Sequence, residues 1–203
     1  LVAVVWAFRY IMITLPQKTE EMMSFRDYRV LSWLYPDLYP DYAYQTVTSV
    51  RAISFGGLLG RGLGNGIVNT PYQENDFVFA LIAEELGLVG CLIVLFLFFY
   101  LVRIIFKISR YAGDIQGQYV SMGIAIHIAM QVILHVAVVT GTVPNTGISL
   151  PFISQGGTAW MIQLAEMGIV LNISRTIKGK RLRSGESAGR LEKRDNRQLR
   201  KTA

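Results

Sequence analysis

One uncharged stretch limits the possible folds of this chain more than any other feature. It runs from Leu86 to Val102 inside a longer apolar segment, 77–106, and Arg103 follows it directly. A helix that crosses a bilayer needs about 20 predominantly apolar residues, whereas a helix on the surface of a soluble protein keeps one polar face. The segment 77–106 is therefore predicted to be a transmembrane helix.

Three further apolar segments, 1–15, 119–140 and 157–174, extend the same pattern. The chain opens at Leu1 inside an apolar run, without a signal-peptide pattern, so we interpret 1–15 as a truncated helix. The expected fold class is all-α, a polytopic membrane helix bundle. Its expected connections are a large ordered external loop at 16–76 with a short helix and a glycine-rich turn, a cytoplasmic loop at 107–118, an external loop at 141–156 and a cytoplasmic tail at 175–203.

The basic residues predict the orientation of the bundle. The tail at 175–203 is rich in lysine and arginine, and cytoplasmic segments next to membrane helices are enriched in these residues. Such a tail also attracts anionic lipid, and because aromatic residues do not alternate with its charges, we do not expect nucleic-acid binding. A single cysteine, Cys91, excludes disulfides within the chain and CxxC metal sites.

Asp76 is the first candidate for chemistry, because it stands where the external loop ends and the apolar helix begins. A lipid-linked substrate could bring its polar head to this carboxylate while its tail stays in the bilayer. An aspartate directly before a helix is also a good N-cap, and capping would favour the ionised form and weaken the carboxylate as a base. Both interpretations of Asp76 stay open on the sequence alone.

Glycines are dense between Gly56 and Gly66, a spacing that permits positive φ and close approach of the backbone to a helix or a ligand. No predicted strand precedes them, so their GxG fragments are not a nucleotide fingerprint. A tight turn is the favoured interpretation, and a backbone cradle for phosphate is the alternative. Arg51 and Arg61 flank the turn, either as pyrophosphate ligands or as solvated charges.

The helix at 119–140 carries His127, Gln131 and His135 at intervals of four residues, so the three share one face. The two histidines are about 12 Å apart, which is too far for one metal ion. Hydrogen bonds between helices are the favoured role. Glu166 lies within the last apolar segment, and an intramembrane carboxylate is a candidate site, with Arg9 as a possible partner.

Several motifs in this order resemble those of the SEDS family, the peptidoglycan glycosyltransferases of the FtsW, RodA and SpoVE type. The motifs are RVLSWLYP at 29–36, GGLLGRGLGN at 56–65, DFVFALIAEELGLVG at 76–90, VTGTVP at 139–144 and LPFISQGG at 150–157. The resemblance covers most of 26–175. Family members have ten membrane helices, so the chain is similar to the last four.

The resemblance implies an enzyme that polymerises lipid II on the outer face of the bacterial cytoplasmic membrane, with the C-terminus inside. It implies a class B penicillin-binding protein and other divisome or elongasome membrane proteins as partners, a possible divalent cation (Mg or Mn) and no organic cofactor. The essential aspartate of the family falls on Asp76. The other expected site residues bind pyrophosphate or support the site: Arg51, Arg61, Gly62, Gly64 and Asn65 in the first group, and Glu84, Glu85, Gln131, Ser154, Gly156 and Gly157 in the second.

The chain departs from the family pattern at several positions. Glu74 and Asn75 replace His-Thr before the aspartate, Gln155 replaces a tyrosine, and His135 stands where asparagine is usual. These departures leave the role in division, elongation or sporulation open. They also leave two alternatives to the enzyme: a lipid II transporter that uses His127, His135 and Glu166, and a non-catalytic scaffold that recruits a penicillin-binding protein.

Overall fold

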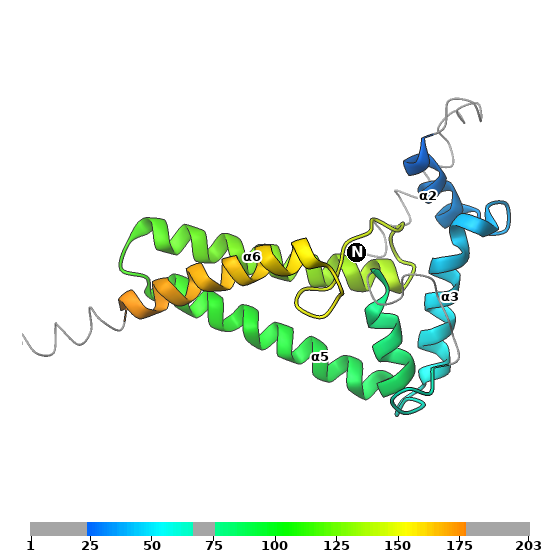
Figure 1. Cartoon of the computed structure of the whole chain (residues 1–203), viewed down its shortest axis with the longest axis horizontal. Helices are drawn as coiled ribbons and strands as arrows, with labels where there is room; N and C mark the ends of the chain where they lie inside the picture. Colours follow the sequence, from blue (N-terminus) through cyan, green and yellow to red (C-terminus); the bar gives the residue numbers. More distant parts are fainter. Residues whose placement is uncertain (1–23, 67–75, 178–203) are drawn as a thin grey trace, which may run out of the picture. The chain divides into compact units, whose positions relative to one another are not determined.

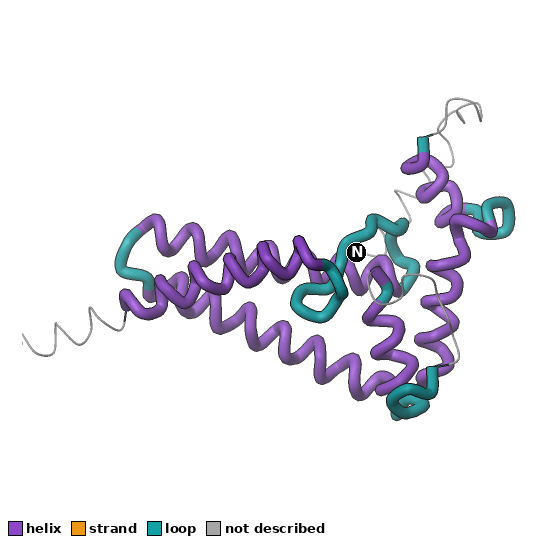
Figure 2. The backbone as a smooth tube through the Cα atoms, viewed as in Figure 1, coloured by secondary structure: helices purple, strands orange, loops and turns teal. Residues whose placement is uncertain are grey.

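The computed structural model of the chain describes residues 24–66 and 76–177, and these residues form helices and loops without a strand (Figure 2). They divide into two compact units. The first contains the described residues up to Phe99 together with Ile128–Trp160, and the second contains Tyr100–His127 and the described residues from Met161. The predicted helix at 1–15, Glu74, Asn75 and most of the basic tail lie outside the described residues.

In the first unit, helix α2 (Phe25–Leu34) begins after Ser24, whose amide N–H donates to the Asp27 carboxylate at 2.9 Å. An acidic side chain in the first turn satisfies a free donor and complements the helix dipole. We expected no helix here, because the charged and aromatic residues of this segment obscure the 3.6-residue repeat of apolar side chains that indicates a helix.

Helix α3 (Pro40–Gly56) follows α2 after a turn at 36–38 (Figure 1). The sequence YPDLYPDY was interpreted as turns throughout, and this was wrong for its second half. Pro40 occupies the first turn, where its missing N–H costs nothing and its fixed φ favours the helix. The Tyr42 ring stacks on Tyr28 of α2 with centroids 5.0 Å apart, which joins the two helices.

Helix α5 (Val78–Tyr111) contains the predicted segment 77–106 but is interrupted at Gly87, where φ is +67° and ψ is −166°. The sequence predicted a continuous helix, because a single glycine within an apolar run carries no clear break signal. The helix also extends past residue 106 as far as Tyr111 and includes Lys107 and Arg110.

Helix α6 (Ile115–Val139) confirms the predicted apolar helix at 119–140 and begins four residues earlier than expected. The connection from α5 is consequently a short turn at 112–114 in the second unit. The Asp114 carboxylate accepts a hydrogen bond from the Gly117 amide at 2.8 Å, and the Ser109 hydroxyl donates to the Gln118 carbonyl at 2.7 Å. These contacts close the turn that we predicted as a loop over 107–118.

The last described helix covers 157–177 and contains the predicted segment 157–174. Before it, in the first unit, an irregular segment follows α6. The Trp160 indole N–H donates to the Ser154 carbonyl at 2.7 Å, and the Ser154 hydroxyl accepts from the Leu150 amide at 2.8 Å. These bonds fix the path of the chain into the helix.

Two of the described helices, α5 and α6, are long and apolar enough to cross a membrane. Large apolar side chains on α5 are exposed, among them Leu92, Phe96 and Phe99, each more than half exposed. Contiguous apolar surface of this kind is rare on soluble monomers. Lipid is the solvent that suits it, which agrees with the membrane class predicted from the sequence.

Candidate active site

Asp76 lies two residues before the start of α5 and next to Phe77, which is fully buried. The carboxylate is partly exposed and accepts no hydrogen bond from the residues that the structure describes. The Phe77 carbonyl, and not the Asp76 side chain, accepts the first amide bonds of the helix, from Ala80 at 2.9 Å and Leu81 at 3.4 Å. The geometry therefore gives no support to the capping interpretation, and it leaves the carboxylate available to a ligand.

The segment after α6 runs beside this carboxylate. A Cβ added to Gly147 would lie 3.8 Å from Asp76 Oδ2 and 3.6 Å from Arg29 Nη1. The Asp76 carboxylate and the Arg29 guanidinium therefore both lie near the Cα of Gly147, on the side where a side chain would project, and its φ of +69° favours glycine at this position. Sequence reasoning placed neither Arg29 nor Gly147 in the site, because contacts between distant segments carry no local signal.

Two further contacts hold the Gly147 segment. The Gly147 amide donates to Asn145 Oδ1 at 3.0 Å, and Asn145 Nδ2 donates to Gln45 Oε1 of α3 at 3.2 Å. His135 of α6, fully buried, lies with Nδ1 2.8 Å from the Ile148 carbonyl oxygen. Helices α3 and α6 therefore both fix the loop beside Asp76.

The glycine-rich stretch, which we call the glycine clasp (residues 56–66), fills the break in α5. At the break, the Glu84 and Glu85 carbonyls accept from the amides of Arg61 and Gly62 at 3.0 and 2.9 Å. After the break, the Leu88 and Val89 amides donate to the carbonyls of Gly57 and Leu58 at 3.0 and 3.2 Å. A break in an apolar helix leaves backbone groups unpaired, and the glycine clasp pairs these four.

Glycine is required in the clasp because the backbones nearly touch. A Cβ on Gly60 would lie 2.1 Å from the Glu85 carbonyl oxygen, and one on Gly56 would lie 1.8 Å from that of Ala83. Gly60 and Gly87 also have positive φ. The prediction that this glycine density permits close approach to a helix is confirmed.

Of the residues expected to bind pyrophosphate, some already have hydrogen-bond partners within the chain and others are exposed. The amides of Gly62 and Gly64 donate within the chain, the latter to Glu85 Oε1 at 3.0 Å, and Asn65 Nδ2 donates to the Arg61 carbonyl at 3.3 Å. A phosphate at these groups would have to displace those acceptors. The Arg61 guanidinium is exposed and lies 5.7 Å from the centroid of the Phe55 ring.

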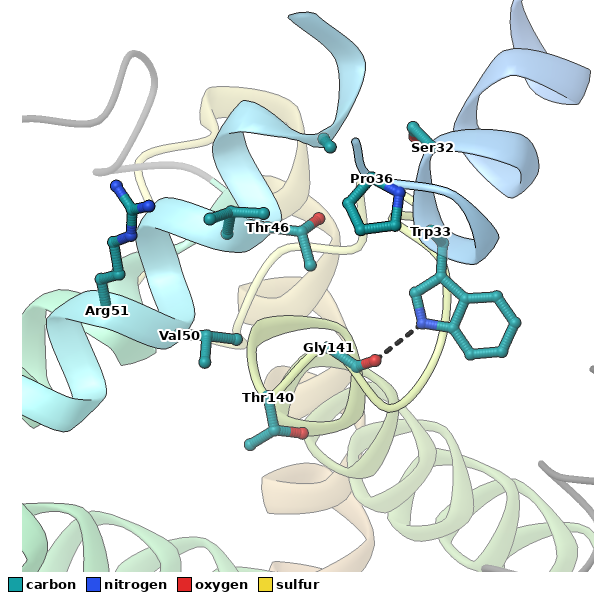
Figure 3. Close-up of a pocket in the computed structure, with 10 residues that line it drawn as sticks. Ser32, Trp33, Pro36, Thr46, Val50, Arg51, Thr140 and Gly141 are labelled. Atoms are coloured by element: carbon teal, nitrogen blue, oxygen red, sulfur yellow. Dashed lines mark hydrogen bonds between the residues drawn. The ribbon is translucent and has the colours of Figure 1, made fainter. Parts of the chain in front are cut away.

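Arg51 is exposed on α3 and borders a cavity of about 310 Å³ in the first unit. Figure 3 shows Arg51 on the other side of the cavity from Trp33, whose indole N–H donates to the Gly141 carbonyl at 2.7 Å. The remaining lining is mainly apolar and contains Val47 and Val50. Among the described residues, neither Arg51 nor Arg61 forms an ion pair with Asp76.

The residues expected to support the site fall into two groups. Glu84 and Glu85 contact the glycine clasp: Glu84 is fully buried, and a Cβ on Gly66 would lie 3.4 Å from Glu84 Oε2. Gln131, Ser154, Gly156 and Gly157 lie further along the chain. Ser154 is buried and holds the 150–160 segment, and the Gly156 carbonyl accepts from the Trp160 amide at 2.9 Å. No described contact joins these four residues to Asp76.

In the second unit, His127 Nδ1 of α6 lies 2.9 Å from Glu166 Oε1 of the 157–177 helix. This contact confirms the predicted role of His127 in hydrogen bonding between helices. Arg9, the other expected partner of Glu166, lies outside the described residues. Within the described ranges, no three His, Cys, Asp or Glu side chains gather where they could hold a metal ion.

The fold and the site together define a helical membrane protein in which a carboxylate, that of Asp76, lies just before an apolar helix and does not cap it. The family model for the FtsW, RodA and SpoVE proteins, described as cell cycle proteins, matches residues 1–179, and the chain belongs to this family. It is 36% identical to the probable peptidoglycan glycosyltransferase FtsW of Trichlorobacter lovleyi, covering 76% of this chain and 42% of the relative. It is 39% identical to the stage V sporulation protein E of Bacillus subtilis, covering 74% and 42%.

A solved structure supports the same assignment. It concerns the structural coordination of polymerization and crosslinking by a peptidoglycan synthase complex, and one of its chains matches with a TM-score of 0.64 and 26% identity. The match covers 87% of this chain and 49% of the other. The chain therefore spans less than half the length of the relatives named above.

Proposed function

We propose that the encoded protein is a peptidoglycan glycosyltransferase that polymerises lipid II, with Asp76 as its general base. The observation that carries the proposal is the carboxylate of Asp76: it lies just before an apolar helix, caps no backbone group among the described residues, and lies near Gly147, as does the Arg29 guanidinium. The names of the relatives, which include peptidoglycan glycosyltransferase, support this activity.

The reaction needs one base. As the acceptor sugar hydroxyl attacks the anomeric carbon of the donor, a C–O bond forms, and the hydroxyl proton passes to the Asp76 carboxylate. The bond from the anomeric carbon to the pyrophosphate breaks, and its electron pair leaves with undecaprenyl pyrophosphate. Because this is a direct displacement, the anomeric configuration inverts.

The leaving group needs positive charge more than it needs an acid. The Arg29 guanidinium lies near Gly147, as does the Asp76 carboxylate, and it can stabilise negative charge that develops on the leaving group. The exposed guanidinium groups of Arg51 and Arg61 are suited to bind the pyrophosphate of an approaching lipid. A divalent cation would add positive charge at the pyrophosphate, but within the described ranges no three His, Cys, Asp or Glu side chains gather to hold one.

The same proposal includes the surroundings of the enzyme. The site faces the outside of the bacterial cytoplasmic membrane, and the basic C-terminal tail lies in the cytoplasm and contacts anionic lipid. A class B penicillin-binding protein is the principal partner, and other divisome or elongasome proteins join it. The solved structure that this chain resembles concerns a peptidoglycan synthase complex, which supports such a partner.

The proposal is tested with the encoded protein and its penicillin-binding partner reconstituted in liposomes with lipid II. The wild type should produce glycan strands, and Asp76→Asn, which keeps the shape of the side chain, should not. Cells that depend on the Asp76→Asn protein should fail to grow; full growth would favour the non-catalytic scaffold instead.

Lipid II transport is a second candidate, favoured by the His127–Glu166 pair. A histidine and a carboxylate paired within apolar helices are the kind of group that carries protons or polar substrates through membranes. Protein-dependent movement of lipid II across a liposome bilayer, lost in His127→Leu and retained in Asp76→Asn, would establish this activity separately from polymerisation.

A further inference from the structure

His135 is a fully buried imidazole in α6 whose contacts determine its tautomer. Its Nδ1 lies 2.8 Å from the Ile148 carbonyl oxygen, which can only accept a hydrogen bond. Nδ1 must therefore carry a proton, and a neutral ring then has an acceptor at Nε2. This Nε2 has no hydrogen-bond partner among the described residues.

The Ile148 carbonyl belongs to the loop beside the proposed base. Its neighbour Gly147 has a φ of +69° and passes close to Asp76 Oδ2 and Arg29 Nη1. The Gly147 amide is held by Asn145, and the Ile148 carbonyl is held by His135. The loop is thus held by hydrogen bonds at the Gly147 amide and at the Ile148 carbonyl, on the two sides of the Gly147 Cα that lies near Asp76.

We propose that His135 is a positioning residue, whose Nδ1–H holds the Ile148 carbonyl and thereby keeps Gly147 beside Asp76 and Arg29. The proposal rests on the general-base role of Asp76. It assigns His135 no contact with the substrate, since the imidazole is fully buried. What His135 supplies is the position of the Gly147 backbone beside the Asp76 carboxylate, and a misplacement of about 1 Å can reduce a rate about 100-fold.

Two isosteric substitutions separate the nitrogens of the ring. In His135→Asn the amide nitrogen occupies the place of Nδ1, whereas in His135→Gln it occupies the place of Nε2. We expect His135→Asn to polymerise lipid II within about 3-fold of the wild-type rate. We expect His135→Gln to lose about 10-fold or more in kcat with little change in KM, because the substrate-binding surface is unaltered.

A second variant protects the test against misfolding. Asn145→Ala releases the same loop from its other anchor, and it should lower kcat in the same manner, whether or not His135→Gln folds. Equal activity of His135→Asn and His135→Gln, or rescue by glutamine and not by asparagine, would overturn the proposal. A change in KM alone would overturn it as well.

A measurement without turnover separates this inference from the proposed function. Hydrogen exchange of the Gly147 amide, which donates to Asn145 Oδ1, should be slow in the wild type and in His135→Asn, and at least about 10-fold faster in His135→Gln. If Asp76→Asn retains polymerisation, the general-base role fails while the exchange result stands. If exchange is the same in all three proteins, the positioning role of His135 fails regardless of activity.

Discussion

Gly60→Ala is the substitution for which the structure gives the sharpest expectation, because the glycine clasp offers a matched control. Gly60 and Gly64 both have a φ of +77°. A Cβ on Gly60 would lie 2.1 Å from the Glu85 carbonyl oxygen, whereas one on Gly64 would have no atom within 4 Å. The two alanine variants therefore share the backbone strain and differ in the steric clash.

The magnitudes follow from these two effects. A left-handed φ costs a non-glycine residue about 1–2 kcal/mol, so Gly64→Ala should lose about that much stability. In Gly60→Ala the clasp must also move away from α5 and break at least two of its four hydrogen bonds, each contributing about 0.5–1.5 kcal/mol. Gly60→Ala should therefore be less stable than Gly64→Ala by about 1–3 kcal/mol.

The assay compares both variants with the wild type in one detergent. The unfolding midpoint, followed by tryptophan fluorescence, should fall further for Gly60→Ala than for Gly64→Ala. Hydrogen exchange should accelerate at the Leu88 and Val89 amides in Gly60→Ala alone, since these amides donate to the clasp. If the two variants have the same midpoint and the same protection at both amides, the reasoning on close approach is refuted.

Two further predictions use other contacts of the first unit. Ser49→Ala removes a buried hydroxyl that donates to the Val139 carbonyl at 3.0 Å, and it should lower the free energy of unfolding by about 1–2 kcal/mol. Ser54 is exposed, so Ser54→Ala should change the unfolding midpoint little. Equal effects of the two substitutions would contradict the role of the α3–α6 bond. Arg29→Gln should lower the polymerisation rate about 10-fold or more, and an unchanged rate would remove Arg29 from the site.

The sequence predicted the parts of the structure that have local causes. The apolar runs indicated α5 and α6, and the placement of Asp76 before an apolar run indicated a carboxylate at the start of a helix. Dense glycine indicated close backbone approach, which Gly56 and Gly60 make against α5. In each case the composition of one short segment was sufficient.

What the sequence did not indicate depends on contacts between distant segments. The break at Gly87 is stable because the clasp pairs the freed backbone groups, and the 86–102 run alone resembles an uninterrupted helix. Arg29 and Asp76 come near the same residue, Gly147, only because α2 and the loop after α6 lie side by side there. The bond between His135 and Ile148 likewise depends on how that loop folds back on α6.

The central claim is that Asp76 accepts a proton during glycosyl transfer, and it is tested most directly by measuring binding and turnover in the same preparation. With Asp76→Asn, the affinity for lipid II should stay within about 3-fold of the wild type, while kcat for strand extension should fall about 100-fold or more. An Asp76→Asn protein that extends strands at nearly the wild-type rate would contradict the claim.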